Sequence, residues 1–213
     1  MNEDILKVLE GISYVATLGV LVVAIFGLRQ ISVTRKIARN SSKREALTLA
    51  SKQVEVYLDK TVKKADALYT ESKKKNLRVF KESTFKISED NIIVDLKPTE
   101  LKAIDEMLSV MKELLDYLNA MEAFSTYFTS KLADEGLAYK SVGRTFCSSV
   151  KMYMPAIVTF GTNEHFQNIL EIYRTWQDRM DEEDLLSSKK EIEKKLGTIN
   201  SKKIVPLGAD TKD

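Results

Sequence analysis

The sequence is poor in the residues that form covalent or metal cross-links, with one cysteine and one histidine in 213 residues. The lone Cys147 cannot close an intramolecular disulfide, and glycine and proline are scarce as well. This composition fits a reducing compartment. With 44% hydrophobic and 30% charged residues, the chain is otherwise ordinary for a globular protein and long enough for one domain with a core.

The sequence also lacks a large excess of charge of one sign. Its 33 basic and 31 acidic residues leave a formal net charge of +2. A protein that binds nucleic acid by neutralising phosphates carries a larger basic excess. We therefore expect no nucleic-acid partner, and any effect of basic residues must be local.

Motifs that carry catalysis or bind cofactors are missing. There is no glycine-rich phosphate loop, cysteine pair, histidine pair at metal-ligand spacing or nucleophile elbow. The single His165 favours a surface or capping role, and Cys147, next to Phe146 in an amphipathic stretch, favours a packed thiol. We expect no enzymatic activity, no cofactor and no metal.

One long uncharged run, residues 11–28, lies between Glu10 and Arg29. As a helix it covers about 27 Å, close to the roughly 30 Å of a bilayer's hydrocarbon core. Acidic rather than basic residues precede it, which argues against a cleaved signal peptide. The run predicts a transmembrane helix, with residues 1–10 as a short extracytoplasmic N-terminus.

A basic cluster follows this run over residues 29–44. Basic residues next to a span remain on the cytosolic side, so we expect a single-pass protein with its N-terminus outside and its C-terminal domain in the cytosol. The same residues can also contact anionic lipid headgroups. The basic cluster consists of Arg29, Arg35, Lys36, Arg39, Lys43 and Arg44.

Small residues recur on one face of the predicted span. Such faces let two helices approach closely in lipid, so this stripe is a candidate helix-helix contact, although small residues are common in spanning helices. The stripe consists of Ser13, Thr17, Ala24 and Gly27, with Val20 between them.

Residues 45–196 are expected to form a cytosolic helical domain. A bend is expected at residues 40–42, and residues 43–75 predict a long amphipathic helix that ends at Asn76. Residues 77–97 fit either a short β-hairpin or an extended loop. The apolar face of the long helix is predicted to comprise Leu47, Ala50, Val54, Leu58, Val62, Ala65 and Tyr69.

Three further helices follow. Thr99 is the expected N-cap of a helix that ends near Leu132. Asp134 is the expected N-cap of the next helix, in which Pro155 marks either a kink or the last turns. The predicted inward residues of these two helices are Leu101, Ile104, Leu108, Met111, Leu115 and Leu118, then Leu137, Val142, Phe146, Val150, Tyr153 and Ile157.

The last predicted helix covers residues 164–196, and its half beyond residue 181 is too charged to be buried. Residues 197–213 are expected to be a disordered tail. The fold class is therefore all-α: a transmembrane helix, a long amphipathic helix and an antiparallel helical bundle, with or without one hairpin. The inward residues of the last helix are predicted to be Phe166, Ile169, Leu170, Tyr173, Trp176 and Met180.

Asn119 and Glu122 follow the strongest apolar stripe, and Glu122 occupies a position where the stripe calls for an apolar residue. A carboxylate beside a core requires a cation, and Arg144 on the next helix is the expected partner. The alternative is that these three residues line a polar pocket, and Glu122 and Arg144 would then carry any enzymatic activity.

Part of the sequence resembles a family of uncharacterised bacterial proteins. The resemblance rests on Leu118-Asn119-x-x-Glu122, Gly136, Met154-Pro155 and Trp176. Members have one N-terminal spanning helix and a cytosolic helical domain of unknown function. The resemblance implies a bacterial inner-membrane protein and transfers no catalytic residue.

These features together predict a membrane-anchored interaction or sensor module. Its expected partners are the lipid bilayer and either another protein or further copies of the chain. The alternative is an effector, for example in bacterial antiviral defence, whose spanning helices oligomerise and perturb the membrane.

Overall fold

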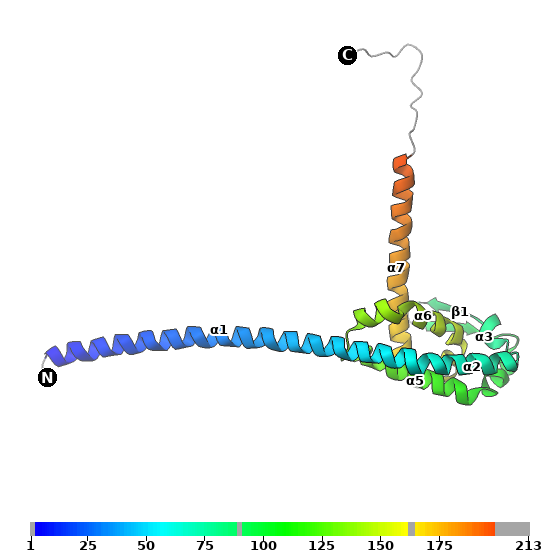
Figure 1. Ribbon diagram of the computed structural model, residues 1–213, viewed down its shortest axis with the longest axis horizontal. Helices are drawn as coiled ribbons and strands as arrows, with labels where there is room; N and C mark the ends of the chain where they lie inside the picture. The colour runs from blue at the N-terminus through cyan, green and yellow to red at the C-terminus, as the bar shows by residue number, and fades with distance from the viewer. Residues whose placement is uncertain (1–2, 89–90, 162–164, 199–213) are drawn as a thin grey trace, which may run out of the picture.

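The computed structural model describes the backbone of residues 3–88, 91–161 and 165–198, and side chains at 11, 19 and from 25 to 196 within those ranges. The described chain is mostly helical with one small sheet (Figure 1), which confirms an all-α architecture with a hairpin. The elements in order are α1 (Glu3–Val56), η1 (Tyr57–Thr61), α2 (Val62–Lys74), α3 (Val79–Glu82), β1 (Thr84–Ser88), β2 (Asn91–Asp95), α4 (Glu100–Leu108), α5 (Met111–Thr129), α6 (Glu135–Phe160) and α7 (Gln167–Thr198).

Helix α1 is one unbroken helix of 54 residues. Figure 1 shows that its N-terminal part extends far from the bundle. Every residue from 25 to 45 is exposed, and Ala50 is the first buried one. The bend predicted at residues 40–42 is wrong, because no glycine or proline interrupts the helix there and the hydroxyl of Ser41 donates to Glu45 at 3.1 Å.

A π-helical turn, η1, joins α1 to α2 and shifts the buried face of the long helix. Tyr57 and Thr61 are buried, whereas Leu58 and Tyr69 are about half exposed. The prediction that Leu58 and Tyr69 belong to the core is therefore wrong. An extra residue in one turn rotates every later side chain around the axis, which a regular three-four spacing cannot anticipate.

Helix α2 ends as the sequence predicts, at a residue in the left-handed region. Asn76 has φ 51°, its N–H donates to the carbonyl of Lys73, and the N–H of Leu77 donates to that of Ser72. This pair of hydrogen bonds is a Schellman motif, and the buried Leu77 completes it.

Residues 84–95 form a β-hairpin, which settles the choice between a hairpin and a loop. Strands β1 and β2 pair antiparallel, with Phe85 opposite Val94 and Ile87 opposite Ile92. One face of the hairpin lies against α6 (Figure 1), and Phe85, Ile92 and Val94 pack against the core. Residues 89–90, between the strands, lie outside the described part.

The expected single helix after Thr99 is two helices. Thr99 is the N-cap, as predicted, and accepts from the N–H of Lys102. Ser109 and Val110 then break the helix, and α4 buries Ala103 and Met107. The predicted inward face was wrong at three positions, because the buried face lies one residue earlier, at Ala103, Met107, Val110 and Leu114. Those exposed positions are Leu101, Leu108 and Leu115.

Helices α6 and α7 match the sequence more closely. Asp134 caps α6 by accepting from the N–H of Leu137 at 2.8 Å. Pro155 lies within the last turns of α6 and is buried. The inward faces predicted for these helices are confirmed except at Leu137 and Leu170, which are only partly buried.

Four aromatic side chains, from η1, α5, α6 and α7, meet in the centre of the core. The ring of Phe124 on α5 lies 4.7 Å from that of Tyr57 and 5.9 Å from that of Phe146. Trp176 on α7 lies 5.0 Å from Phe146 and is fully buried. This cluster holds η1, α5, α6 and α7 together.

A membrane crossing needs a long apolar helix, and the described residues contain none that qualifies. The side chains of Ser13, Thr17 and Ala24 lie outside the described part, as do residues 199–213 of the expected disordered tail. The predictions made for these positions stay predictions.

Replacing Met107 by alanine should lower the free energy of unfolding by about 2–5 kcal/mol, because it leaves a cavity in the core. The same change at Leu101, which is 80% exposed, should alter it by less than about 0.5 kcal/mol. Chemical denaturation of the two variants measures both values. Equal losses would mean that Leu101 belongs to the buried face, as the apolar stripe in the sequence predicts.

Candidate functional site

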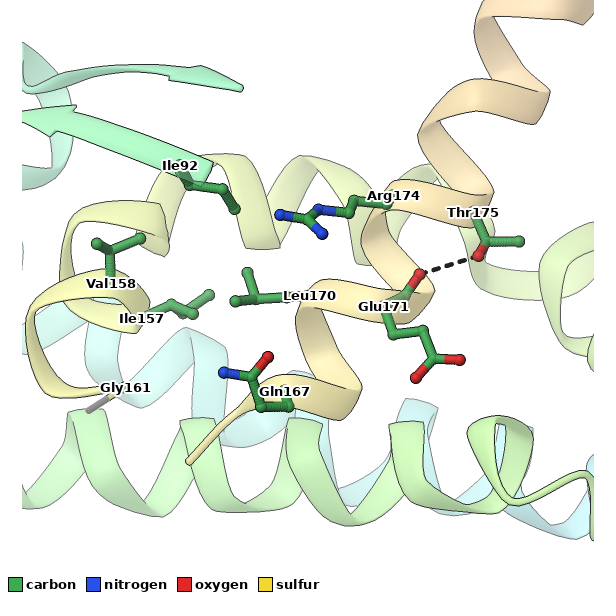
Figure 2. Close-up of a pocket in the computed structure, with 9 residues that line it drawn as sticks. All are labelled: Ile92, Ile157, Val158, Gly161, Gln167, Leu170, Glu171, Arg174 and Thr175. Atoms are coloured by element: carbon green, nitrogen blue, oxygen red, sulfur yellow. Dashed lines mark hydrogen bonds between the residues drawn. The ribbon is translucent and has the colours of Figure 1, made fainter. Parts of the chain in front are cut away.

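The bundle carries a candidate site in a cleft of about 550 Å³ between the end of the hairpin and helices α6 and α7. Figure 2 shows that β2 and α6 supply one wall and the first turns of α7 the other. The first wall is apolar, whereas the second presents amide, carboxylate, guanidinium and hydroxyl groups. The lining residues are Ile92, Ile157, Val158, Gly161, Gln167, Leu170, Glu171, Arg174 and Thr175.

Helix α7 forms the polar side of the cleft. The hydroxyl of Thr175 donates to the backbone carbonyl of Glu171 at 2.9 Å. In Figure 2 the guanidinium of Arg174 extends toward Ile92 across the open space, while the Glu171 carboxylate points away from it. An apolar wall facing a cation suits binding of an amphipathic or anionic group.

Glu122 holds the start of α7 and does not pair with Arg144. Its carboxylate accepts from the side-chain amide of Asn168 at 2.6 Å and from the backbone N–H groups of Asn168 and Ile169 at 3.3 and 3.0 Å. These N–H groups belong to the first turn of α7, which has no intrahelical acceptors for them. The hydroxyl of Thr129 also donates to Asn168, at 2.5 Å. Glu122 is thus a helix cap supplied by a neighbouring helix.

Arg144 and Asn119 lie away from that cap. Arg144 is exposed on α6, and its guanidinium lies 3.6 Å from the carboxylate of Asp184 on α7. Asn119 is exposed on α5. The predicted buried pair or pocket of Asn119, Glu122 and Arg144 is therefore wrong. A half-buried carboxylate needs a partner, and for Glu122 the partners are backbone N–H groups and an amide in place of a cation.

A second polar cluster, not predicted from the sequence, fastens the middle of α7 to the start of α6. The indole N–H of Trp176 donates to the carboxylate of Glu135. The other carboxylate oxygen of Glu135 accepts from Arg179 at 3.0 Å, and the Arg179 guanidinium lies 4.5 Å above the ring of Tyr139. The one signal in the sequence was the three-residue spacing of Trp176 and Arg179, which places both on one face of a helix.

The single histidine lies at the surface, whereas the single cysteine lies in the core. His165 is exposed in the turn just before α7. Cys147 is buried on α6, and burial raises the pKa of its thiol from 9.0 to about 12. The thiol is therefore protonated at neutral pH and a poor nucleophile. Among the described residues no group of three potential ligands is placed to hold a metal.

The basic cluster lies on the extended part of α1, and all six of its side chains are exposed. Exposed apolar residues are interleaved with it, among them Ile31, Val33 and Ile37. Gly27 is also exposed, and nothing would contact a β-carbon placed there. This helix surface is thus open along its whole circumference.

Neither models of known protein families, nor curated proteins, nor solved structures give a match to this chain.

Replacing Glu122 by alanine should destabilise the protein by about 1–3 kcal/mol, because the N–H groups at the start of α7 lose their charged acceptor. Asn119→Ala, an exposed change on the same helix, is the matched control and should have little effect. Chemical denaturation reports both. If the loss of stability in Glu122→Ala disappeared when Arg144 was replaced as well, the result would instead support the ion pair between Glu122 and Arg144 that the sequence predicted.

Cys147 should react with a thiol reagent at least about a hundredfold more slowly in the native protein than after denaturation. The raised pKa also makes stability pH-dependent: the contribution of the protonated thiol is complete below pH 9.0 and is lost as the pH rises toward about 12. The rates of thiol labelling with and without denaturant test whether Cys147 is buried and protonated. Fast native labelling at neutral pH would contradict it.

Proposed function

We propose that this chain is a membrane-tethered helical module that senses a ligand or recruits a partner on the cytosolic side, with no catalytic role. The observation that carries the proposal is the continuity of α1. One helix contains the uncharged run of residues 11–28 and also contributes Ala50 to the core. The turn η1, which begins with the buried Tyr57, directly follows the end of this helix. A tilt or rotation at its N-terminal end therefore reaches the bundle without an intervening hinge.

The membrane anchor is proposed on the sequence of residues 11–28, whose side chains lie mostly outside the described part. The exposed basic cluster that follows supports the same placement. Each cation near an anionic leaflet contributes about 1 kcal/mol, and a basic excess on one side fixes a span's orientation. We infer a single-pass protein of a bacterial inner membrane with its C-terminal domain in the cytosol, as the family resemblance also implies.

The cleft supports a sensing role. It lies between the hairpin and the first turns of α7, which are held in place by Glu122 from outside the helix. A ligand in the cleft would contact α6, α7 and β2 together. Binding there can bias the position of α7 relative to the rest of the bundle.

The second candidate function is a membrane-perturbing effector that oligomerises through α1. It is favoured by the exposed apolar residues at the C-terminal end of the run, namely Ile25, Phe26 and Leu28, and by the open surface at Gly27. Replacing Gly27 by leucine should weaken such an assembly while leaving a simple tether in the membrane. Toxicity on overexpression that disappears in this variant would favour the effector.

Leu21→Asp should release the full-length protein from the membrane fraction, because a carboxylate at the centre of a span costs roughly 2.5–3.5 kcal/mol. Thr34→Asp, on the exposed part of the same helix, is the matched control and should remain bound. Alkaline extraction of membranes followed by detection of the intact chain measures both. The anchor would be disproved if the unchanged protein were extracted as readily as Leu21→Asp.

A further inference from the structure

A small pocket lies where the chain reverses after α2. The reversal occurs at Asn76, and α3 then packs on α6. The pocket is lined by residues of α2, α3 and α6 and has a volume of about 70 Å³. Figure 1 shows that α2 ends and α3 begins at the end of the bundle remote from the N-terminus of α1. The exposed part of α1 therefore does not cover this pocket.

The wall of the pocket is mostly apolar. The ring of Phe80 on α3 meets that of Tyr153 on α6 edge to face, with 5.1 Å between their centroids, and the buried Leu77 lines the pocket beside them. Tyr69 of α2 and Met152 of α6 also line it and are 50% and 44% exposed. Tyrosine and methionine are enriched on surfaces through which proteins bind one another. Apolar surface thus continues from the inside of the pocket onto the face around it.

The volume of the pocket selects the kind of occupant. Sites that enclose a small-molecule ligand measure about 300–1,000 Å³, whereas a single water needs about 10–15 Å³. The volume of about 70 Å³ lies between these limits and admits the end of one side chain. In protein interfaces, pockets of this kind receive single large residues that carry much of the affinity. The size therefore favours a side chain of a partner protein over a metabolite.

Two lysines give the pocket a positive charge. Lys73 of α2 and Lys81 of α3 line it, and both are exposed. Within the described ranges no carboxylate pairs with either lysine, and the nearest acids in the sequence, Glu71 and Glu82, pair with other cations at 2.6 Å. Asp66, further back on α2, does not line the pocket. Because opposite charges attract across an interface, this face suits an acidic segment.

The hydroxyl of Ser72 makes the pocket selective for a side chain with a polar end. It lines the pocket from α2, is shielded from solvent and has no hydrogen-bond partner in the described part of the chain. A buried hydroxyl left unpaired is unfavourable. A tyrosine that enters with its hydroxyl first provides a partner for Ser72, whereas a phenylalanine does not.

We propose that this pocket docks a partner protein through one tyrosine within an acidic segment. The end of the phenol ring packs against Phe80 and Tyr153, and its hydroxyl pairs with that of Ser72. Acids on either side of the tyrosine face Lys73 and Lys81. This docking site rests on the recruiting role in the proposed function and is separate from the cleft beside the hairpin.

A short acidic peptide tests the docking site directly. The probe is the synthetic peptide acetyl-Asp-Glu-Tyr-Glu-Asp-amide, titrated by calorimetry into the full-length protein in lipid nanodiscs, with empty nanodiscs as the blank. We expect one binding site per chain. Lys73→Glu and Lys81→Glu should each weaken binding by about tenfold, because a carboxylate there repels the acidic peptide. Lys140→Glu, the same change at an exposed position near the other end of α6, is the matched control and should bind like the parent.

Exchanging the tyrosine of the peptide tests the role of Ser72. The parent protein should bind the tyrosine peptide about fivefold more tightly than the same peptide with phenylalanine, which is the effect of one hydrogen bond between neutral groups. In Ser72→Ala this preference should disappear. The variant should fold normally, because the hydroxyl that it removes makes no hydrogen bond within the described residues and alanine favours a helix.

Absence of binding to the parent protein, or equal affinities of Lys73→Glu and Lys140→Glu, would overturn the docking site. A preference for tyrosine that persisted in Ser72→Ala would overturn it as well. These results do not depend on the membrane anchor, whose test is extraction of the chain from membranes.

Discussion

The contact among Tyr57, Phe124, Phe146 and Trp176 is the interaction on which the rest of the structure depends. Each ring comes from a different segment, and their centroids lie 4.7 to 6.4 Å apart. Large buried rings contribute most of the apolar area of a small core. Tyr57 in particular places the end of α1 inside the bundle, so the long exposed helix is fixed by its last residues and by the π-helical turn that orients them.

Carboxylates also join neighbouring helices to one another, by hydrogen bonds and an ion pair. Glu122 of α5 accepts from the first turn of α7, and Glu106 of α4 accepts from the N–H groups of Arg78 and Val79 at the start of α3. Glu135 then binds the middle of α7. In each case a negative charge meets donors that the helix leaves unpaired, or a cation. These polar contacts fix the direction of α7, and with it the position of the cleft.

The sequence predicted the features that depend on a few neighbouring residues. The caps at Thr99 and Asp134 and the end of the long helix at Asn76 follow from local chemistry and were predicted correctly. So were the inward faces of α6 and α7 at most positions, since no irregular turn interrupts them.

Features that depend on irregular turns or on distant residues could not be predicted in this way. Leu58 and Tyr69 were misassigned because the π-helical turn that begins at Tyr57 rotates the chain, and such turns have no clear sequence signal. In α4 and α5 the buried face lies one residue away from the predicted apolar stripe. The partners of Glu122 are backbone groups of another helix, which side-chain types do not reveal. The cleft likewise draws on β2, α6 and α7, segments that are far apart in the chain.

We propose that α1 transmits motion to the bundle as one rigid helix. The most direct measurement is the distance distribution between nitroxide labels at Val33 and Lys151, both exposed, in the full-length protein in lipid bilayers. A single narrow distribution is expected, because α1 is continuous from residue 3 to residue 56 and ends beside the buried Tyr57. A broad or two-component distribution would reveal a hinge in α1, and the bundle could then not respond to the membrane through this helix.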